Sequence, residues 1–318
     1  MMKNLRIGTR GSKLALWQAN WVKREINRYD PDISISLVKI KTTGDKILDS
    51  PLAKIGGKGL FVKEIEEALL REEIDIAVHS MKDVPAELPE GLIIGVVTKR
   101  EDPRDVLISR SGESLSELKI GAKIGTTSLR RKAQLLNLRP DFEIFPLRGN
   151  LDTRIRKIYT EGLDAIIVAA AGVKRLLLDK NITEYIEPEV SLPAIGQGAL
   201  AIEIRKYDVE TENIIKKLDH LETRIAVYSE RAFSKRLGGG CQTPVAAHGK
   251  VENSNIILHG MIADVDGSEL IKDKISGNKE EYEKLGLELA ERMLKNGGSR
   301  ILEKILGSSN RDKPWSLL

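Results

Sequence analysis

The chain contains a single cysteine, Cys241, in a setting that could support covalent chemistry. Three consecutive glycines, 238–240, come directly before it, and Pro244 follows shortly after. Because glycine loses the most conformational entropy on folding, a folded chain keeps such a triplet where the backbone turns sharply or where a bulky group must approach closely. Two interpretations stay open: a group attached to the Cys241 sulfur, or a buried thiol that packs as a small hydrophobic side chain.

A second candidate is Asp83, which lies in the polar run 79–85. Residues 75–78 are typical of a short buried strand, and ligands of open α/β sheets bind beyond the carboxyl ends of strands. A carboxylate at that edge, with Lys82 beside it, is suited to stabilising a cation that forms during a reaction. A capping or salt-bridged aspartate would fit the same position.

A third candidate is the basic segment 128–160, which contains eight basic and three acidic residues, an excess larger than the net charge of +4 of the whole chain. Arg130 and Arg131 fall in the first turn of an expected helix, where backbone N–H groups already favour an anion. Arg148 and Arg154 repeat the arrangement further along, and guanidinium groups bind carboxylates in a bidentate manner. The segment predicts an anionic ligand, although a solvated helix face, a phosphate or a nucleic acid would also fit it.

Other kinds of site have less support. The four histidines lack the paired spacing of a metal site, and a single cysteine excludes an internal disulfide and thiolate-rich zinc sites. No GxSxG hydrolase signature and no helix-turn-helix pattern is present, and an aromatic content of 4% offers few platforms for stacking bases. No apolar run reaches the roughly 18 residues of a membrane span, and residues 1–20 lack a signal-peptide segment. We therefore expect a cytoplasmic protein that binds no metal, nucleic acid or membrane.

The elements that position these residues follow an alternating α/β pattern. A length of 318 residues, with 41% apolar and 31% charged residues, is typical of a globular chain of two or three domains. Residues 7–15 and 124–133 both read as strand, polar turn and helix, which predicts two similar lobes with a ligand cleft between them. A chance likeness between two such units is the alternative. Where the first lobe has Ser80 and Asp83, the second has small packing residues, so the chemistry is expected in the first.

After about residue 220 the pattern changes and predicts a third, smaller α+β domain that carries Cys241. Asn278 is expected to cap the last helix of this domain, and a glycine pair to end it. The expected elements are a helix at 221–237, strands near 245–251 and 256–264, and a helix at 280–296.

These motifs together resemble the porphobilinogen deaminase family, also called hydroxymethylbilane synthases. The resemblance runs in register from Arg6 to about Gly249 and is looser beyond it. The motifs that carry it are Ile7-Gly8-Thr9-Arg10-Gly11-Ser12, His79-Ser80-Met81-Lys82-Asp83-Val84-Pro85, Gly125-Thr126-Thr127-Ser128-Leu129-Arg130-Arg131, Leu147-Arg148-Gly149-Asn150 with Thr153-Arg154, Gln197-Gly198-Ala199-Leu200, and Gly239-Gly240-Cys241-Gln242-Thr243-Pro244-Val245.

The resemblance implies a three-domain enzyme whose first two α/β lobes are similar to periplasmic solute-binding proteins. It implies a transferase that deaminates four porphobilinogen molecules, joins them head to tail onto a dipyrromethane cofactor, and releases linear hydroxymethylbilane and ammonia in tetrapyrrole biosynthesis. The expected boundaries are 1–99 with 194–218 for the first lobe, 100–193 for the second, and 219–318 for the C-terminal domain.

Residue roles are implied by the same resemblance. Cys241 holds the dipyrromethane through a thioether, and Asp83 is the catalytic carboxylate, which accepts hydrogen bonds from pyrrole N–H groups and stabilises a cationic azafulvene. Each pyrrole carries an acetate and a propionate, which accounts for the many separate arginines. The implied cofactor-binding residues besides Cys241 and Asp83 are Lys82, Ser128, Arg130 and Arg131; the implied substrate-binding residues are Arg10, Arg148, Arg154 and Arg175; and Lys58 belongs to a glycine-rich lid at 42–59.

Further implications are a monomer and a product that passes to uroporphyrinogen-III synthase. A solute-binding or ligand-responsive transcription module is the chief competing class, since a two-lobed cleft lined by arginines serves small anions in general. That class leaves the Gly-Gly-Gly-Cys run without a purpose, and the sequence shows neither an export signal nor a DNA-binding segment. A nucleic-acid-binding protein is a more distant alternative, supported by the basic segment alone.

Overall fold

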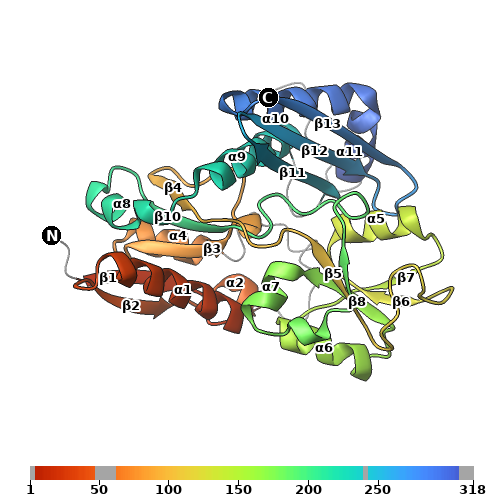
Figure 1. The fold of residues 1–318 in the computed structure, drawn as a ribbon, viewed down its shortest axis with the longest axis horizontal. Coiled ribbons are helices and arrows are strands. Elements are labelled where there is room, and N and C mark those ends of the chain that lie inside the picture. Colours follow the sequence, from red (N-terminus) through yellow and green to blue (C-terminus); the bar gives the residue numbers. More distant parts are fainter. Residues whose placement is uncertain (1–3, 47–61, 239–242, 308–318) are drawn as a thin grey trace.

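The computed structural model describes residues 4–46, 62–238 and 243–307, and it divides into two α/β lobes and a smaller C-terminal domain (Figure 1). The predicted fold class is confirmed. The predicted sites at Cys241 and Lys58, and most of the predicted lid, lie outside the described residues. Among the helices that the structure describes, none has the length and apolar character needed to cross a membrane.

The first lobe is built on a five-stranded sheet with the order β2-β1-β3-β10-β4. The strand β1 pairs in parallel with β2 and β3, whereas β10 is antiparallel to both of its neighbours. β10 therefore belongs to this sheet although it follows the second lobe in the chain. The elements are β1 (Asn4–Thr9), α1 (Lys13–Tyr29), β2 (Ser34–Lys39), α2 (Thr43–Lys46), α4 (Lys63–Leu70), β3 (Ile76–Ser80), β4 (Leu92–Val97), β10 (Leu200–Arg205) and α8 (Val209–Ile215).

The second lobe repeats this plan in a sheet with the order β7-β6-β8-β5-β9. Its strand β6 is parallel to β7 and β8, and β5 is antiparallel to β8 and β9, as β10 is to its neighbours in the first lobe. The predicted likeness of the two lobes is confirmed at the level of topology. The elements are β5 (Asp105–Ser109), β6 (Lys123–Gly125), α5 (Leu129–Leu138), β7 (Glu143–Phe145), α6 (Leu151–Thr160), β8 (Ala165–Ala169), α7 (Ala170–Arg175) and β9 (Glu184–Ile186).

Two segments, one around Glu101 and one around Gly198, cross between the lobes. They lie side by side, and the N–H of Glu101 donates to the carbonyl of Gly198 at 3.2 Å. The second segment also reaches β3, since the N–H of Met81 donates to the carbonyl of Ala199 at 3.0 Å. The crossing thus runs directly beside the carboxyl end of β3, where Asp83 was predicted to act.

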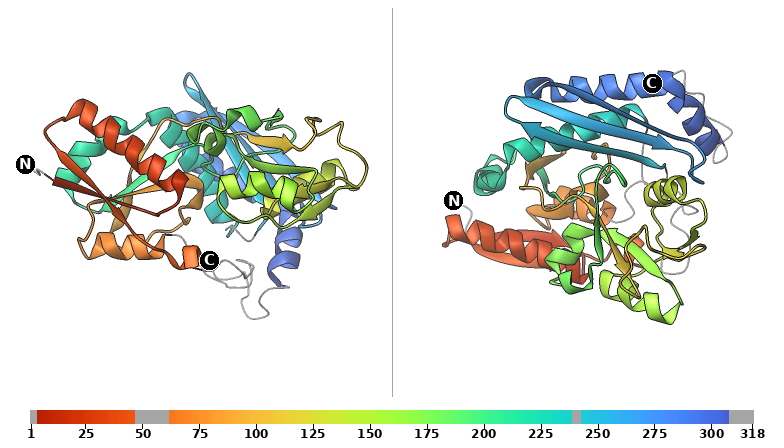
Figure 2. Two further views of the ribbon diagram at one scale, coloured as in Figure 1. Left: turned by 90° about the horizontal axis from the view of Figure 1, so that it is seen from below. Right: turned by 45° about the vertical axis from the view of Figure 1, so that its right-hand side comes forward.

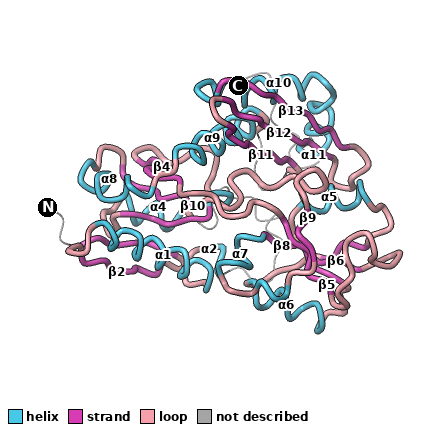
Figure 3. The backbone as a smooth tube through the Cα atoms, in the orientation of Figure 1, coloured by secondary structure: helices cyan, strands magenta, loops and turns pink. Residues whose placement is uncertain are grey.

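The C-terminal domain is an antiparallel sheet, β11-β12-β13, packed against helices (Figures 2 and 3). Its core includes Phe233 and Met293, both fully buried. The domain lies against both lobes in Figure 1, with α9 next to β4 and α5 next to β12. The elements are α9 (Leu221–Arg236), β11 (Val245–Glu252), β12 (Asn255–Ala263), β13 (Leu270–Asn278), α10 (Tyr282–Met293) and α11 (Ser299–Gly307).

The helix expected at 280–296 is shorter than predicted. Asn278 does act as a cap, but for a 3-10 turn: its side chain accepts from the N–H of Glu280 at 3.0 Å, and α10 starts after that turn. The helix then widens into a π-type turn that Gly297 interrupts with a φ of +105°, a conformation that glycine adopts without strain. The strand β13 and the helix α11 were not predicted.

Candidate functional site

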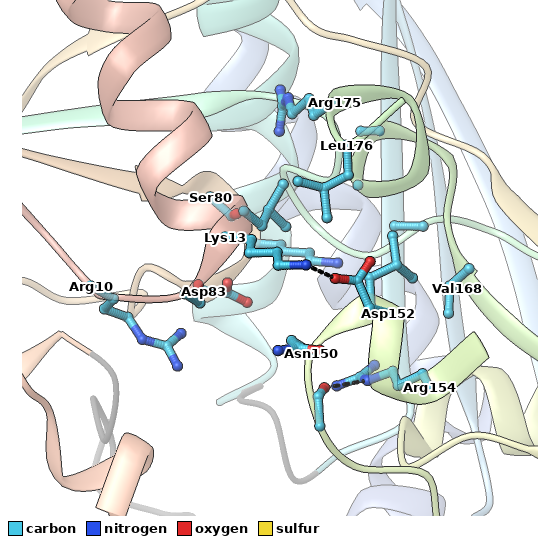
Figure 4. A pocket seen from close by; sticks show the side chains of 18 of the residues that line it. Arg10, Lys13, Ser80, Asp83, Asn150, Asp152, Arg154, Val168, Arg175 and Leu176 are labelled. Atoms are coloured by element: carbon cyan, nitrogen blue, oxygen red, sulfur yellow. Dashed lines mark hydrogen bonds and ion pairs between the residues drawn. The ribbon is translucent and has the colours of Figure 1, made fainter. Parts of the chain in front are cut away.

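A cavity of about 840 Å³ lies between the two lobes, in the size range of small-molecule sites. Among the described residues, nine basic and only two acidic side chains line it. Figure 4 shows basic residues from both lobes around this space, with Arg10 and Arg154 on opposite sides of Asp83. The predicted site residues that line the cavity are Arg10, Lys82, Asp83, Arg131, Arg148, Arg154 and Arg175.

The first lobe contributes the turn that follows β3. The strand ends at Ser80, whose hydroxyl accepts from Nε2 of Gln18 at 2.8 Å, and a 3-10 turn over Met81–Asp83 follows. Met81 is buried against Gly196, where a Cβ would lie 2.4 Å from Cγ of Met81 and where φ is +70°. Gly196 thus lets the backbone approach closely. The buried methionine anchors the turn, and Lys82 and Asp83 are left at the cavity wall.

The second lobe contributes the start of α6. Asn150 caps this helix by accepting from the N–H of Thr153 at 3.1 Å, and Nε of Arg154 donates to the carbonyl of Gly149 at 2.8 Å. The Nη2 of Arg148 is buried and has no hydrogen-bond partner among the described residues. A buried donor without a partner is costly, so a ligand acceptor at this position would be stabilising.

The positive charge of the cavity is only partly neutralised by the protein. Burial lowers the pKa of Arg154, and the nearby Arg131 lowers it further. Burial also lowers the pKa of Arg175 to about 10; this side chain is 8% exposed and donates to the carbonyl of Gly198 at 2.6 Å. Each of these pKa values would rise towards its ordinary value beside a carboxylate, so the site favours an anionic ligand.

The predicted arginine pair on α5 is held by a carboxylate that the sequence did not reveal. Asp105 is fully buried, with Oδ2 2.8 Å from Nη1 of Arg130 and Oδ1 2.7 Å from Nη2 of Arg131. Burial alone would raise the pKa of Asp105, but the two guanidinium groups outweigh it and hold the pKa well below its usual range. Asp105 therefore supplies a buried counter-charge to both arginines.

Two predicted cofactor-binding residues do not line the cavity. Arg130 is buried and donates to the carbonyl of Leu192 at 2.6 Å in addition to its pair with Asp105. Ser128 caps α5 by accepting from the N–H of Arg131 at 3.4 Å. In the described arrangement Arg130 shares the counter-charge of Asp105 with Arg131, Ser128 caps the helix that bears Arg131, and neither lines the space between the lobes.

Gln197 connects Asp105 to the first lobe. Its Nε2 donates to Oδ1 of Asp105 at 2.9 Å and to the carbonyl of Pro103 at 2.6 Å, while its Oε1 accepts from Nζ of Lys82 at 3.4 Å. A chain of hydrogen bonds thus runs from the arginines of the second lobe to the residue beside Asp83. Burial lowers the pKa of Lys82 to about 8, although the charge of Asp83 opposes this shift.

This pKa predicts an alkaline limit to substrate capture. Below pH 8 Lys82 is a cation that attracts carboxylates, and above it the neutral amine no longer does, so kcat/KM should fall as the pH rises through about 8. In Lys82→Arg the group stays charged, and the fall should move to higher pH. The measurement is the pH profile of kcat/KM for both proteins. If the two profiles fall at the same pH, another group sets the limit.

Several residues that line the cavity were not predicted from the sequence. Lys39 and Lys41 line the cavity at the end of β2, and the rule that placed Asp83 at a strand's carboxyl end would have found them. Lys13 also lines the cavity and forms an ion pair across the lobes with Asp152 (Figure 4). Asp105 gave no signal, because a single carboxylate before a short apolar run has many structural explanations.

The cavity fits a ligand with several carboxylates. Its surplus of basic side chains and the unpartnered Nη2 of Arg148 suit acetate and propionate groups, and Asp83 provides an acceptor suited to pyrrole N–H groups. A dipyrromethane has both kinds of group, so the residues present are compatible with it.

Comparison with known proteins agrees with this chemistry. The family model described as "Porphobilinogen deaminase, dipyromethane cofactor binding domain" matches residues 5–213, and that described as "Porphobilinogen deaminase, C-terminal domain" matches residues 224–295. A porphobilinogen deaminase of Geotalea uraniireducens is 57% identical over 304 residues, which cover 96% of this chain and 95% of the relative. One from Pelobacter propionicus is 56% identical over 303 residues, covering 95% and 97%.

Solved structures with a loosely similar fold share little sequence identity with this chain. The sulphonate-binding protein SsuA of Escherichia coli superposes with a TM-score of 0.40 and 17% identity, covering 74% of this chain and 70% of its own. Likeness at this level is loose, and nothing about function is inferred from it. Because family models span most of the sequence and curated relatives are more than half identical over nearly all of it, the chain belongs to the porphobilinogen deaminase family.

Proposed function

We propose that this protein joins four porphobilinogen molecules head to tail on a dipyrromethane held by Cys241, and releases linear hydroxymethylbilane and ammonia. The observation that carries the proposal is the cavity between the lobes, where nine basic side chains surround two carboxylates, one of which is Asp83 at the carboxyl end of β3. Membership of the porphobilinogen deaminase family supports the same activity. When bound, the dipyrromethane supplies the free pyrrole α-carbon to which a substrate unit is joined.

In this proposal the basic residues bind the acetate and propionate groups of cofactor and substrate. Arg148 offers its unpartnered Nη2, and Arg131 is oriented by Asp105 so that its charge lies at the cavity wall. A guanidinium group forms two parallel hydrogen bonds with a carboxylate, and several separate arginines fix the orientation of a flexible ligand. The proposed carboxylate-binding residues that line the cavity are Arg10, Lys82, Arg131, Arg148, Arg154 and Arg175. For Ser128 and Arg130, which do not line it, the family resemblance alone supports a role in binding the cofactor.

Asp83 is proposed as the catalytic carboxylate. A substrate that loses ammonia leaves a cationic pyrrole, and a fixed negative charge beside it lowers the barrier to its formation. Asp152, the other acidic residue of the cavity wall, is ion-paired with Lys13. Asp83 therefore has the position and charge for this role. Its carboxylate can also accept the pyrrole N–H groups and hold them in line for bond formation.

The proposal extends to features for which family membership is the support. These are a lid that contains Lys58, a cytoplasmic monomer, and transfer of the product to uroporphyrinogen-III synthase. Sheet membership supports the proposed domain boundaries, because β10 lies in the first sheet and β5 to β9 form the second. The proposed domains are 1–99 with 194–218, 100–193, and 219–318.

Intact-protein mass spectrometry tests the attachment. The wild-type protein should carry the mass of two pyrrole units, and Cys241→Ala should carry none and show no turnover, because the chain contains no other cysteine. Peptide mapping of the wild-type protein should place the added mass on Cys241. An unmodified thiol in freshly purified, active protein would refute the proposal, and an adduct on Cys241→Ala would move the attachment elsewhere.

A further inference from the structure

Arg231 makes an unusual set of contacts from the C-terminal domain to the first lobe. It lies on α9, and its guanidinium donates to three successive backbone carbonyls that come directly after Asp83 in the chain. The distances are 3.3 Å from Nη1 to the carbonyl of Val84, 2.6 Å from Nη2 to that of Pro85, and 3.1 Å from Nη2 to that of Ala86. One side chain thus fixes the backbone path by which the chain leaves the Asp83 turn.

These contacts do not belong to an ion pair. Among the described residues, no carboxylate lies within ion-pair distance of the half-buried guanidinium of Arg231. Burial lowers the pKa of Arg231, while the negative charge of Glu203 opposes this shift. Backbone carbonyls are the groups that satisfy its donors, and their directional hydrogen bonds define the position of the loop.

The turn that bears Asp83 is also restrained on the side before Asp83, where Met81 packs against Gly196 and Lys82 donates to Gln197. It is a single 3-10 turn without a side-chain cap, held by the Met81 N–H to Ala199 bond and by a 3.1 Å bond from the N–H of Val84 to the carbonyl of Met81. Val84 is buried in the same hydrophobic cluster as Val227, one turn before Arg231 on α9. On the side that follows Asp83, the loop is held by Arg231 and by the burial of Val84, so the position of Asp83 depends in part on how this loop is attached to α9.

The same helix leads towards the proposed cofactor attachment. α9 ends at Arg236, and Cys241 follows five residues later in the sequence. We propose that Arg231 is a positioning residue for the reaction: it holds the Asp83 turn at a fixed place relative to the helix that precedes Cys241. This inference rests on the proposed function, in which Asp83 and Cys241 act on the same ligand.

Arg224, two turns earlier on α9, also joins this helix to the first lobe. It donates to the carbonyl of Gly95 at 2.6 Å and forms a paired contact with Asp219, with Nε 2.9 Å from Oδ2 and Nη2 2.7 Å from Oδ1. It thus attaches α9 to β4, away from the Asp83 turn. Arg224→Met is therefore the matched control for the loss of an arginine that joins α9 to the first lobe.

The test compares Arg231→Met, Arg231→Lys and Arg224→Met by steady-state kinetics, thermal unfolding and intact mass. A displacement of about 1 Å at a catalytic group can cost about a hundredfold in rate, so we expect kcat of Arg231→Met to fall by about ten- to a hundredfold while KM changes less than about threefold. Arg231→Lys should recover part of the loss, because an ammonium reaches one or two of the carbonyls but not all three. The two-pyrrole adduct should be present in all three variants.

Arg224→Met should lower the unfolding temperature but keep kcat within about twofold of the wild-type value. The proposal is overturned if kcat of Arg231→Met is unchanged, or if it falls no further than that of Arg224→Met, since Arg231 then only docks the helix. If Arg231→Met does not fold, Arg231→Gln takes its place, and an unchanged kcat in that variant has the same meaning. Absence of the adduct from the wild-type protein would instead refute the proposed function, and so the two failures are distinguishable.

Discussion

Asp83→Asn is expected to lower turnover by about two to three orders of magnitude, the loss typical of removing one group that stabilises transition-state charge. The substitution keeps the size and planar shape of the side chain but removes the negative charge that would face the cationic pyrrole. Asp83 is exposed at the wall of the cavity and lies outside the core clusters, so the fold should survive. Steady-state assays of hydroxymethylbilane formation, together with intact mass, measure both effects.

Two further variants separate charge from position. Asp83→Glu keeps the charge but displaces it by one methylene, and we expect turnover between that of the wild type and that of Asp83→Asn. Glu87→Gln removes a negative charge from the same loop, where Glu87 pairs with Lys235 at the surface, and should leave turnover near the wild-type value. Near-normal turnover in Asp83→Asn would exclude the electrostatic role.

Asp105→Asn should destabilise the protein by about 3–5 kcal/mol, the cost of removing one partner from a buried ion pair. The substitution leaves Arg130 and Arg131 as buried cations without a counter-charge, since their side chains are 6% and 8% exposed. Because the pKa of Asp105 is held below its usual range, the wild-type advantage should be complete at neutral pH and shrink only as the pH falls below about 4. Urea unfolding at several pH values measures it.

Asp141→Asn is the matched control for this prediction. Asp141 also binds an arginine of the second lobe in a bidentate manner, with both oxygens 2.8 Å from Arg139, but the pair lies near the surface. Loss of this ion pair should lower the free energy of unfolding by no more than about 1 kcal/mol. Equal destabilisation by the two substitutions would show that burial of the Asp105 pair adds nothing. A stable Asp105→Asn protein would mean that the arginines find other partners.

Much of the fold followed from local sequence patterns. Strand, polar turn and helix could be recognised at 7–15 and again at 124–133, and the predicted helix 221–237 agrees with α9 to one residue. The strands β5 and β13 were missed for different reasons. The apolar run of β5 is only three residues long, and β13 is an edge strand whose Lys272, Asp273 and Lys274 interrupt the alternation that marks a half-buried strand.

The candidate site, too, was predictable from the sequence in part. Residue types and their places after strands or at helix starts were enough to select Asp83 and the arginines 131, 148 and 154, all of which the structure brings to one cavity. The same patterns selected Arg130 and Ser128, which do not line the cavity: Arg130 pairs with Asp105, and Ser128 caps α5. Position along a helix start does not say which of two neighbouring arginines faces the ligand, because that depends on where a counter-charge lies.

By itself, then, the sequence determined the lobes, the excess of positive charge, and the presence of one carboxylate and one thiol suited to pyrrole chemistry. Only the tertiary structure decided how these charges are paired. Asp105 meets Arg131 because β5 lies beside β8 in the second sheet, and Gln197 meets Lys82 because the chain crosses back to the first sheet through β10. Electrostatic energy depends on distances between residues far apart in the chain, and local patterns of polarity do not contain those distances.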